Sequence, residues 1–237
     1  MESLFTYVAP PSPCGYLPEQ SWSLEYEYVG DITAAEYERR MQEGWRHFGR
    51  MLFHPACRHC RACRSLRIPA ARFRPDRSQR RCWKLNCDEV RLEIGEPAVS
   101  KAKLKLYDRY HAFQATHKGW PLHPAKDAES YCESFVRNPF DVQEWCYYLG
   151  RHLVAVGYVD DLPGSYSAIY YFYDPDQRDR SLGAFNVLSI LDRARRAGKE
   201  HVYLGYYVDG CGSMEYKIRF RPNQLLGIDG QWREFVK

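Results

Sequence analysis

The chain has 237 residues, 45% of them hydrophobic and 15% aromatic, and a formal net charge of +4 at pH 7. This composition supplies enough apolar surface for a packed core and excludes an intrinsically disordered chain. The sequence has no run near the ~20 apolar residues that span a bilayer, and its start, MESLFTYVAPPSPC, lacks the basic and apolar regions of a secretory signal. We therefore expect a globular, cytoplasmic protein without a membrane partner.

The first segments predict an extended arm followed by a helix. Residues 9–18 are too rich in proline for a helix and should present Cys14 at a turn. Thr33 and Glu36 have the spacing of a capping box, and aromatic and apolar residues follow at helical intervals. This pattern predicts a helix over 34–48 whose aromatic stripe faces the core.

Two short strands and a domain boundary are predicted in the next part of the chain. Residues 66–73 and 90–94 have the β-branched and apolar character of short strands. The Gly-Glu-Pro sequence after the second strand is typical of a linker. We therefore predict an N-terminal Cys/Arg-rich domain over 1–95 and a second domain over 96–237.

The second domain alternates predicted helices and strands. Caps and periodicity predict helices over 100–117 and 127–136, and a third that is capped by Ser181 and ended by Gly198. Alternating apolar residues predict strands over 144–149, 153–159, 167–173 and 201–208. The order of three strands, a helix and a strand predicts an α/β (α+β) fold with a mixed sheet and flanking helices.

Three cysteines lie at intervals of three residues, at Cys57, Cys60 and Cys63. A loop with this spacing can fold three thiolates around one ion, which predicts a structural zinc or an iron–sulfur cluster. We expect Cys14 as the fourth ligand, with these possible substitutes: His54, His59, Cys82 and Cys87. The alternative is a set of metal-free thiols made reactive by neighbouring arginines.

The positive charge of the chain is concentrated around these cysteines. Residues 46–91 hold thirteen basic residues against three acidic ones, whereas residues 1–45 hold two against eight. Guanidinium groups bind phosphate oxygens, and an aromatic ring such as Trp83 can stack on an unpaired base. We therefore predict RNA contact by this strip: Arg72, Arg74, Arg77, Arg80 and Arg81. The alternative is a solvated basic surface.

The turn from the third strand to the last helix is similar to the acyl-donor loop of the GNAT-type acyltransferases, which use acetyl-CoA. The segment Arg180-Ser-Leu-Gly183-Ala184-Phe185 opens the helix, where backbone N–H groups can bind an anion. Phe185 occupies a position that is small in that superfamily, so the loop fits a donor other than coenzyme A. We therefore expect a GNAT-type sheet that is adapted to a different acyl donor.

Taken together, the motifs resemble the aminoacyl-tRNA protein transferases over nearly the full chain. The resemblance is closest to the short bacterial branch, the aspartate/glutamate leucyltransferases. It rests on these segments: Cys14 to Pro18, Gly44-Trp45-Arg46, Cys57 to Cys63, Arg77 to Arg81, Tyr171 to Pro175, Arg180 to Gly183, and Tyr203 to Tyr207 followed by Cys211, Met214, Tyr216, Lys217 and Phe220.

The resemblance implies that leucine, in preference to arginine, is transferred from charged tRNA to proteins that begin with Asp or Glu. This transfer marks those proteins for degradation. The α-amine would attack an ester that is already activated, so no covalent intermediate and no cofactor is needed for the chemistry. As hypotheses, Asp174 orients or deprotonates the amine, and Ser181, Tyr206 and Tyr207 donate hydrogen bonds near the carbonyl. The candidate cations for the acidic acceptor are Arg77, Arg80, Lys217 and Arg219.

Two other functions compete with this one. A coenzyme A acyltransferase would explain the second domain but not the Cys/Arg window. A noncatalytic zinc-ribbon RNA-binding protein would explain the window but not the motifs around Asp174 and Lys217.

Overall fold

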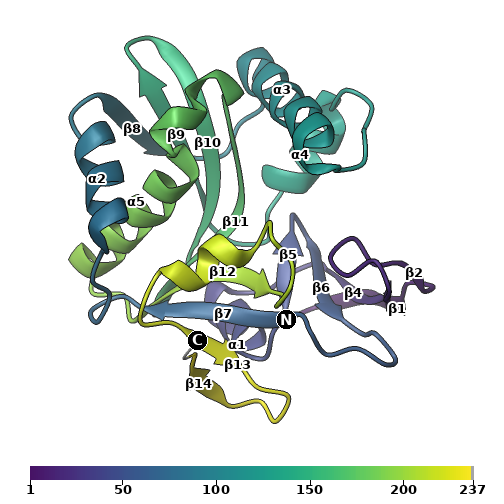
Figure 1. Ribbon diagram of the computed structural model, residues 1–237. Coiled ribbons are helices and arrows are strands. Elements are labelled where there is room, and N and C mark those ends of the chain that lie inside the picture. Colours follow the sequence, from purple (N-terminus) through teal and green to yellow (C-terminus); the bar gives the residue numbers. More distant parts are fainter. Residues whose placement is uncertain (236–237) are drawn as a thin grey trace.

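A large mixed sheet forms the centre of the protein (Figure 1). The computed structural model describes residues 1–235, and in this part of the chain the sheet has the order β14-β13-β7-β12-β11-β10-β9-β8. Only β11 and β12 run parallel. The strands are β7 (Arg64–Pro69), β8 (Val90–Gly95), β9 (Val142–Leu149), β10 (His152–Asp161), β11 (Ser165–Tyr173), β12 (His201–Tyr207), β13 (Gln224–Leu226) and β14 (Trp232–Glu234).

The parallel pair opens into a wedge. β11 and β12 are paired only from Ser165 with His201 to Ser167 with Tyr203, although both strands continue beyond that point. Gly205 has a φ of +73° and lies where the pairing of β12 with β7 shifts its register. A non-glycine residue adopts such a φ only with strain, so glycine allows the bend that separates the two strand ends.

Helices cover both faces of this sheet. α2 (Arg77–Asn86) packs on α5 (Leu182–Arg196), and the α5 residues Leu188 and Ile190 lie in the larger hydrophobic core. On the other face, α3 (Lys101–Lys118) and α4 (Ala128–Phe135) pack against Val156 and Phe172 in a second core. Successive strand residues point to opposite faces, which lets one sheet serve both cores.

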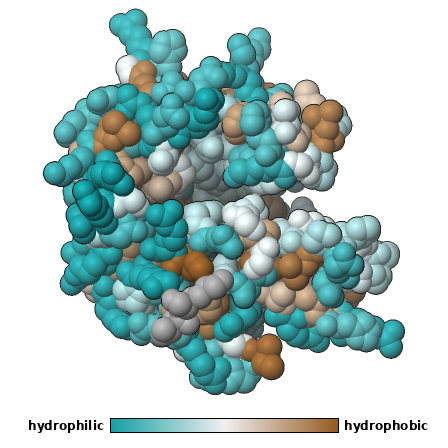
Figure 2. All heavy atoms as spheres, viewed as in Figure 1, coloured by the Kyte–Doolittle hydropathy of each residue, from teal (hydrophilic) through white to brown (hydrophobic). Residues whose placement is uncertain are grey.

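The N-terminal residues form a second, four-stranded sheet with the order β1-β4-β6-β5. Its elements and the short segments around it are β1 (Ser3–Val8), β2 (Ser12–Pro13), β3 (Ser21–Trp22), β4 (Leu24–Val29), α1 (Ala34–Gln42), β5 (Arg46–Phe48) and β6 (Met51–Pro55). A third core joins it to the large sheet through Tyr203, and buried His47 bonds Asp160 at 2.8 Å. Figure 2 shows the surface hollowed between the half with α3 and α4 and the half with this small sheet.

Most predicted elements of the second half are confirmed, including the mixed sheet and its flanking helices. The helix predicted over 34–48 is wrong in length, because α1 ends at Gln42 and Gly44 takes a φ of +101°. Residues 46–48 are instead strand β5, and Trp45 reaches the core by stacking on His54 at 5.2 Å. The strand expected to reach Phe73 ends at Pro69, and helix α2 was not predicted.

The division of the chain at residue 96 stays a prediction. Strands β7 and β8 precede it and still belong to the large sheet, so strands from both sides of this position share one hydrogen-bonded layer. None of the helices within residues 1–235 is both long and apolar enough to cross a membrane.

Candidate functional site

Two cations lie in the wedge between β11 and β12. Arg46, on β5, donates from Nη2 to the carbonyl of Ala168 on β11 at 2.8 Å. Lys217, on the short 3-10 helix η2 (Glu215–Arg219), donates from Nζ to the carbonyl of Tyr206 on β12 at 2.5 Å. A Cβ atom built on Gly205 would lie 3.9 Å from Arg46 Nη2 and 4.0 Å from Lys217 Nζ. The two positive groups therefore converge on the same small space.

Neither cation is neutralised by a carboxylate of the described residues. Arg46 is only 6% exposed, and its buried Nη1 atom has no hydrogen-bond partner. Burial, and after it the charge of Arg46, lower the pKa of Lys217 to about 7, while Cys211 acts in the opposite direction. This arrangement costs free energy in the absence of an anion, because desolvated like charges repel each other.

Tyr206 and Tyr207 point in different directions, as neighbours on a strand do. The hydroxyl of Tyr206 donates to the carbonyl of Gly44 at 2.7 Å, and burial raises its pKa above the usual range. The hydroxyl of Tyr207 donates to Asp209 at 3.0 Å, and its ring belongs to the core that contains α5. Of the two predicted tyrosines, Tyr206 is therefore the one on the side of Arg46.

Asp174 and Ser181 have structural partners at the two ends of η1 (Pro175–Arg180). Asp174 caps this 3-10 helix by accepting the N–H of Asp176, and it forms an ion pair with Arg109 at 3.0 Å. Ser181 has a φ of 53° and makes no side-chain cap, so the predicted serine cap of α5 is wrong although the helix begins at Leu182. The catalytic roles of both residues stay predictions.

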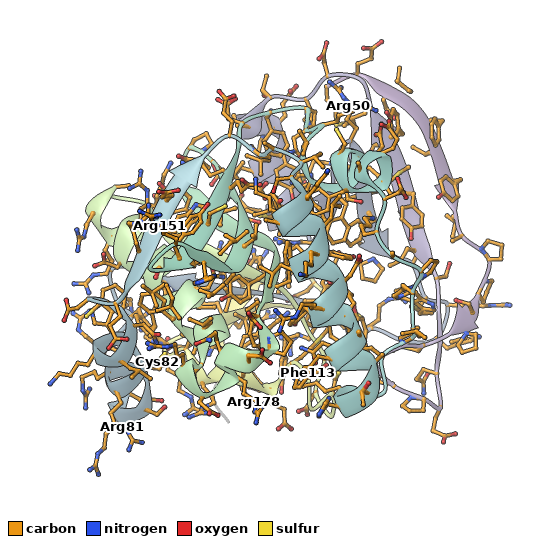
Figure 3. All side chains as sticks on the ribbon, turned by 90° about the horizontal axis from the view of Figure 1, so that it is seen from above. Arg50, Arg81, Cys82, Phe113, Arg151 and Arg178 are labelled. Atoms are coloured by element: carbon orange, nitrogen blue, oxygen red, sulfur yellow. The ribbon has the colours of Figure 1, made fainter. Side chains whose placement is uncertain are left out.

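Three of the five arginines predicted to bind RNA lie on an exposed surface of α2, whereas Arg72 and Arg74 precede the helix and Arg72 forms an ion pair with Glu234 at 3.2 Å. Arg77, Arg80 and Arg81 are exposed, and Figure 3 shows Arg81 pointing outward from the helix. Arg219 is near them, since its Nη2 donates to Ser78 at 3.1 Å. Trp83 is half-buried and packs on Phe185 with ring centroids 5.5 Å apart, and its stacking on an unpaired base stays a prediction.

Replacing Arg80 and Arg81 together by alanine is expected to weaken tRNA binding about tenfold at low salt and to flatten its salt dependence, because two phosphate contacts would be lost. The measurement is a filter-binding titration at several salt concentrations. The double variant Arg193→Ala with Arg195→Ala removes the same charge from exposed positions on α5 and serves as control. Equal behaviour of the two double variants would place the RNA contact elsewhere.

Four cysteines line one small cavity of about 40 Å³. Cys14, Cys57, Cys60 and Cys63 line it together with Tyr206. Burial, followed by the neighbouring thiols, raises the pKa of Cys63 to about 12. Within residues 1–235 no three His, Cys, Asp or Glu side chains are arranged to hold a metal ion. The donor set fits zinc or iron chemically, but the described thiols do not form a coordination shell.

The other candidate ligands have different surroundings. His54 stacks on Trp45, Cys82 donates to the carbonyl of Ser181 at 3.5 Å, and Cys87 is exposed. Cys211, which the sequence did not suggest as a ligand, contributes to the raised pKa of Cys63. The sequence also assigned no role to Arg46, although the Gly-Trp-Arg motif that contains it was part of the resemblance.

Comparison with solved structures gives the fold class. A structure described as "Crystal structure of FemX" aligns with a TM-score of 0.52 over 94% of this chain and 86% of that chain, at 8% sequence identity. The protein therefore has the mixed α/β fold of FemX.

Comparison with sequences gives the family. Residues 12–81 match the description "Arginine-tRNA-protein transferase, N terminus", and residues 102–227 match its C terminus. An aspartate/glutamate leucyltransferase of Pseudomonas putida (strain GB-1) is 38% identical over 230 residues, which cover 95% of this chain and 94% of that protein. One from Pseudomonas aeruginosa (strain LESB58) is 34% identical over the same shares. The chain belongs to the arginine-tRNA-protein transferase family, so the predicted class of aminoacyl-tRNA protein transferases is confirmed.

Proposed function

We propose that this enzyme transfers leucine from leucyl-tRNA to the N-terminal Asp or Glu of proteins in the cytoplasm and so marks them for degradation. The names of relatives that are 34–38% identical over nearly the whole chain support leucine as the donated residue and acidic acceptors. The family description, which names arginine, makes arginyl-tRNA the second candidate donor. The observation in this chain that supports an acidic acceptor is the uncompensated pair of cations in the wedge.

The proposed reaction is direct aminolysis of an ester. The neutral α-amine attacks the carbonyl carbon that joins leucine to the tRNA ribose, a C–N bond forms, and the C–O ester bond breaks. The proton lost from the amine ends on a base, and the ribose oxygen leaves with a proton as a hydroxyl. Holding the two substrates together supplies much of the rate enhancement, and no cofactor takes part in the chemistry.

We place this reaction at the open end of the wedge. Asp174 follows β11 and is the proposed base or orienting group, and Tyr206 lies on β12 beside Lys217. The roles of Ser181 and Tyr207 as hydrogen-bond donors are retained only as predictions. We also propose that the fold is of the GNAT type, which the unit of β11, α5 and β12 supports.

The test is a transfer assay with the purified protein. Leucyl-tRNA and arginyl-tRNA are supplied in parallel with peptides that begin with Asp, Glu or Ala, and acetyl-CoA is supplied as a separate donor. We expect labelled leucine on the Asp and Glu peptides only. Absence of transfer from both charged tRNAs, or acylation from acetyl-CoA, would contradict the proposal.

We further propose that Cys14, Cys57, Cys60 and Cys63 bind a structural zinc or iron–sulfur cluster. The gathering of four thiols around one cavity supports this ligand set. Protein purified without oxygen is expected to contain about one zinc ion, or the iron of one cluster, per chain, as structural cysteine sites do. Elemental analysis and thermal melting provide the measurement.

The matched control is another cysteine. Cys60→Ser should release metal and lower the melting temperature, whereas Cys132→Ser, on α4, should change neither. The site is ruled out if the purified wild-type protein is fully active without metal and if Cys60→Ser melts at the same temperature as the wild type.

A further inference from the structure

The cations in the wedge include a buried guanidinium nitrogen without a hydrogen-bond partner. Arg46 is nine-tenths buried, one of its guanidinium nitrogens lacks a hydrogen-bond partner, and Lys217 lies beside it. A buried guanidinium costs free energy unless its donors are used. A bound anion would use the free Nη1 donor and would balance both charges.

The position of these groups separates them from the exposed basic strip. Arg77, Arg80 and Arg81, which are predicted to bind RNA, are exposed on α2, whereas Arg46 and Lys217 donate to carbonyls of β11 and β12. The two side chains converge on one point, because a nitrogen of each lies about 4 Å from the position that a Cβ atom on Gly205 would take. A planar carboxylate can offer an oxygen to each cation, whereas a phosphate diester brings two bulky substituents.

We propose that Arg46 and Lys217 bind the side-chain carboxylate of the acceptor's first residue and so determine the preference for Asp and Glu. This inference rests on the proposed function and adds a residue, Arg46, to it. In an N-terminal Asp the carboxylate is only a few bonds from the α-amine. Binding it beside Gly205 therefore holds the attacking nitrogen close to Ala168 and Gly205.

Both cations contribute, in different ways. Arg46 is fixed by Ala168 and presents a rigid, permanently charged donor. Lys217 sits at the half-exposed side of the pair, and the carbonyl of Tyr206 holds its ammonium. The acidic side chain would thus meet Lys217 first and Arg46 behind it.

The experiment measures acceptor selectivity in variants that remove one charge while keeping the length of the side chain. Arg46→Met and Lys217→Met are assayed with peptides that begin with Asp or with its neutral isostere Asn, and kcat/KM is determined for both. We expect each variant to lower the ratio of Asp to Asn at least about tenfold, through the Asp value, because one charge-assisted contact is lost. The KM for leucyl-tRNA should stay within about twofold of the wild type, since neither residue belongs to the RNA strip.

Direct binding separates this inference from the proposed function. Fluorescence anisotropy with labelled Asp and Asn peptides should show preferential binding of the Asp peptide by the wild type, and the two methionine variants should lose it. Selective binding without any transfer would refute the proposed function and keep the carboxylate site. Transfer with an unchanged Asp to Asn ratio in both variants would refute the carboxylate site and keep the proposed function.

One further outcome would contradict the inference, and two variants complete the test. If the variants keep their ratio but raise the KM for leucyl-tRNA, the cations bind the RNA and the inference is wrong. Circular dichroism shows whether Arg46→Met folds. If it does not, Lys217→Met alone provides the test, because Lys217 is only half-buried and its replacement should be tolerated. Arg46→Lys keeps the charge without the planar fork and should give an intermediate ratio.

Discussion

The variant Gly205→Ala is expected to lower leucine transfer to an Asp peptide by about 10- to 100-fold, because small displacements of bound substrates have effects of this size. The added methyl group would occupy the space beside Arg46 and Lys217, 3.9 and 4.0 Å from their nitrogens. The acceptor carboxylate would then be excluded from the point where the two cations converge. Steady-state kinetics with Asp and Asn peptides provides the measurement, and the loss should be larger for Asp.

Gly198→Ala is the matched control for this variant. Gly198 follows α5 and has a φ of +68°, close to the +73° of Gly205, but nothing lies within 4 Å of its Cβ position. Both substitutions should destabilise the fold by about 1 kcal/mol, since alanine is strained at positive φ. Only Gly205→Ala should impair transfer. If the two variants lose activity equally, backbone strain rather than the occupied space explains the effect.

The parts of the fold that the sequence predicted are those with local signals. α3 and α4 have serine and aspartate caps followed by helical spacing, and the glycine in the turn after β9 joins two alternating strands. The error at residues 43–48 has a physical reason: the aromatic residues keep helical spacing past Gly44, but the chain turns at Gly44 and Trp45 reaches the core from that turn by stacking on His54. Spacing alone does not distinguish these two routes to the same core.

The residues of the candidate site also differ in whether a local sequence signal predicted them. The proximity of Cys57, Cys60 and Cys63 follows from their three-residue spacing, and Cys14 lines the same cavity, whereas metal binding by the four stays a prediction. The wedge depends on contacts between Arg46, Ala168, Gly205 and Lys217, which are far apart in the chain. Arg46 also lies in a window of thirteen basic residues, so its charge did not set it apart. Its burial, which gives it chemical significance, is a property of the tertiary structure.

Lys103 offers the largest expected effect on stability. It lies on α3 but is 8% exposed, forms an ion pair with Glu144 on β9, and donates to the carbonyl of Ala98 at 2.8 Å. Glu144 is 5% exposed and also accepts the hydroxyl of Tyr158 at 2.9 Å. Removing the ammonium leaves a buried carboxylate without its counter-ion. Lys103→Met should therefore lower the free energy of unfolding by about 3–5 kcal/mol.

Denaturant unfolding of three variants tests whether the buried charge is the cause. Lys105→Met removes an exposed lysine from the same helix and should change the free energy of unfolding by less than about 0.5 kcal/mol. The double variant Lys103→Met with Glu144→Gln should recover most of the loss, because the neutral amide oxygen still accepts from Tyr158 and no unpaired charge remains buried. If the double variant is as unstable as Lys103→Met alone, the loss comes from packing of the lysine side chain and not from the isolated carboxylate.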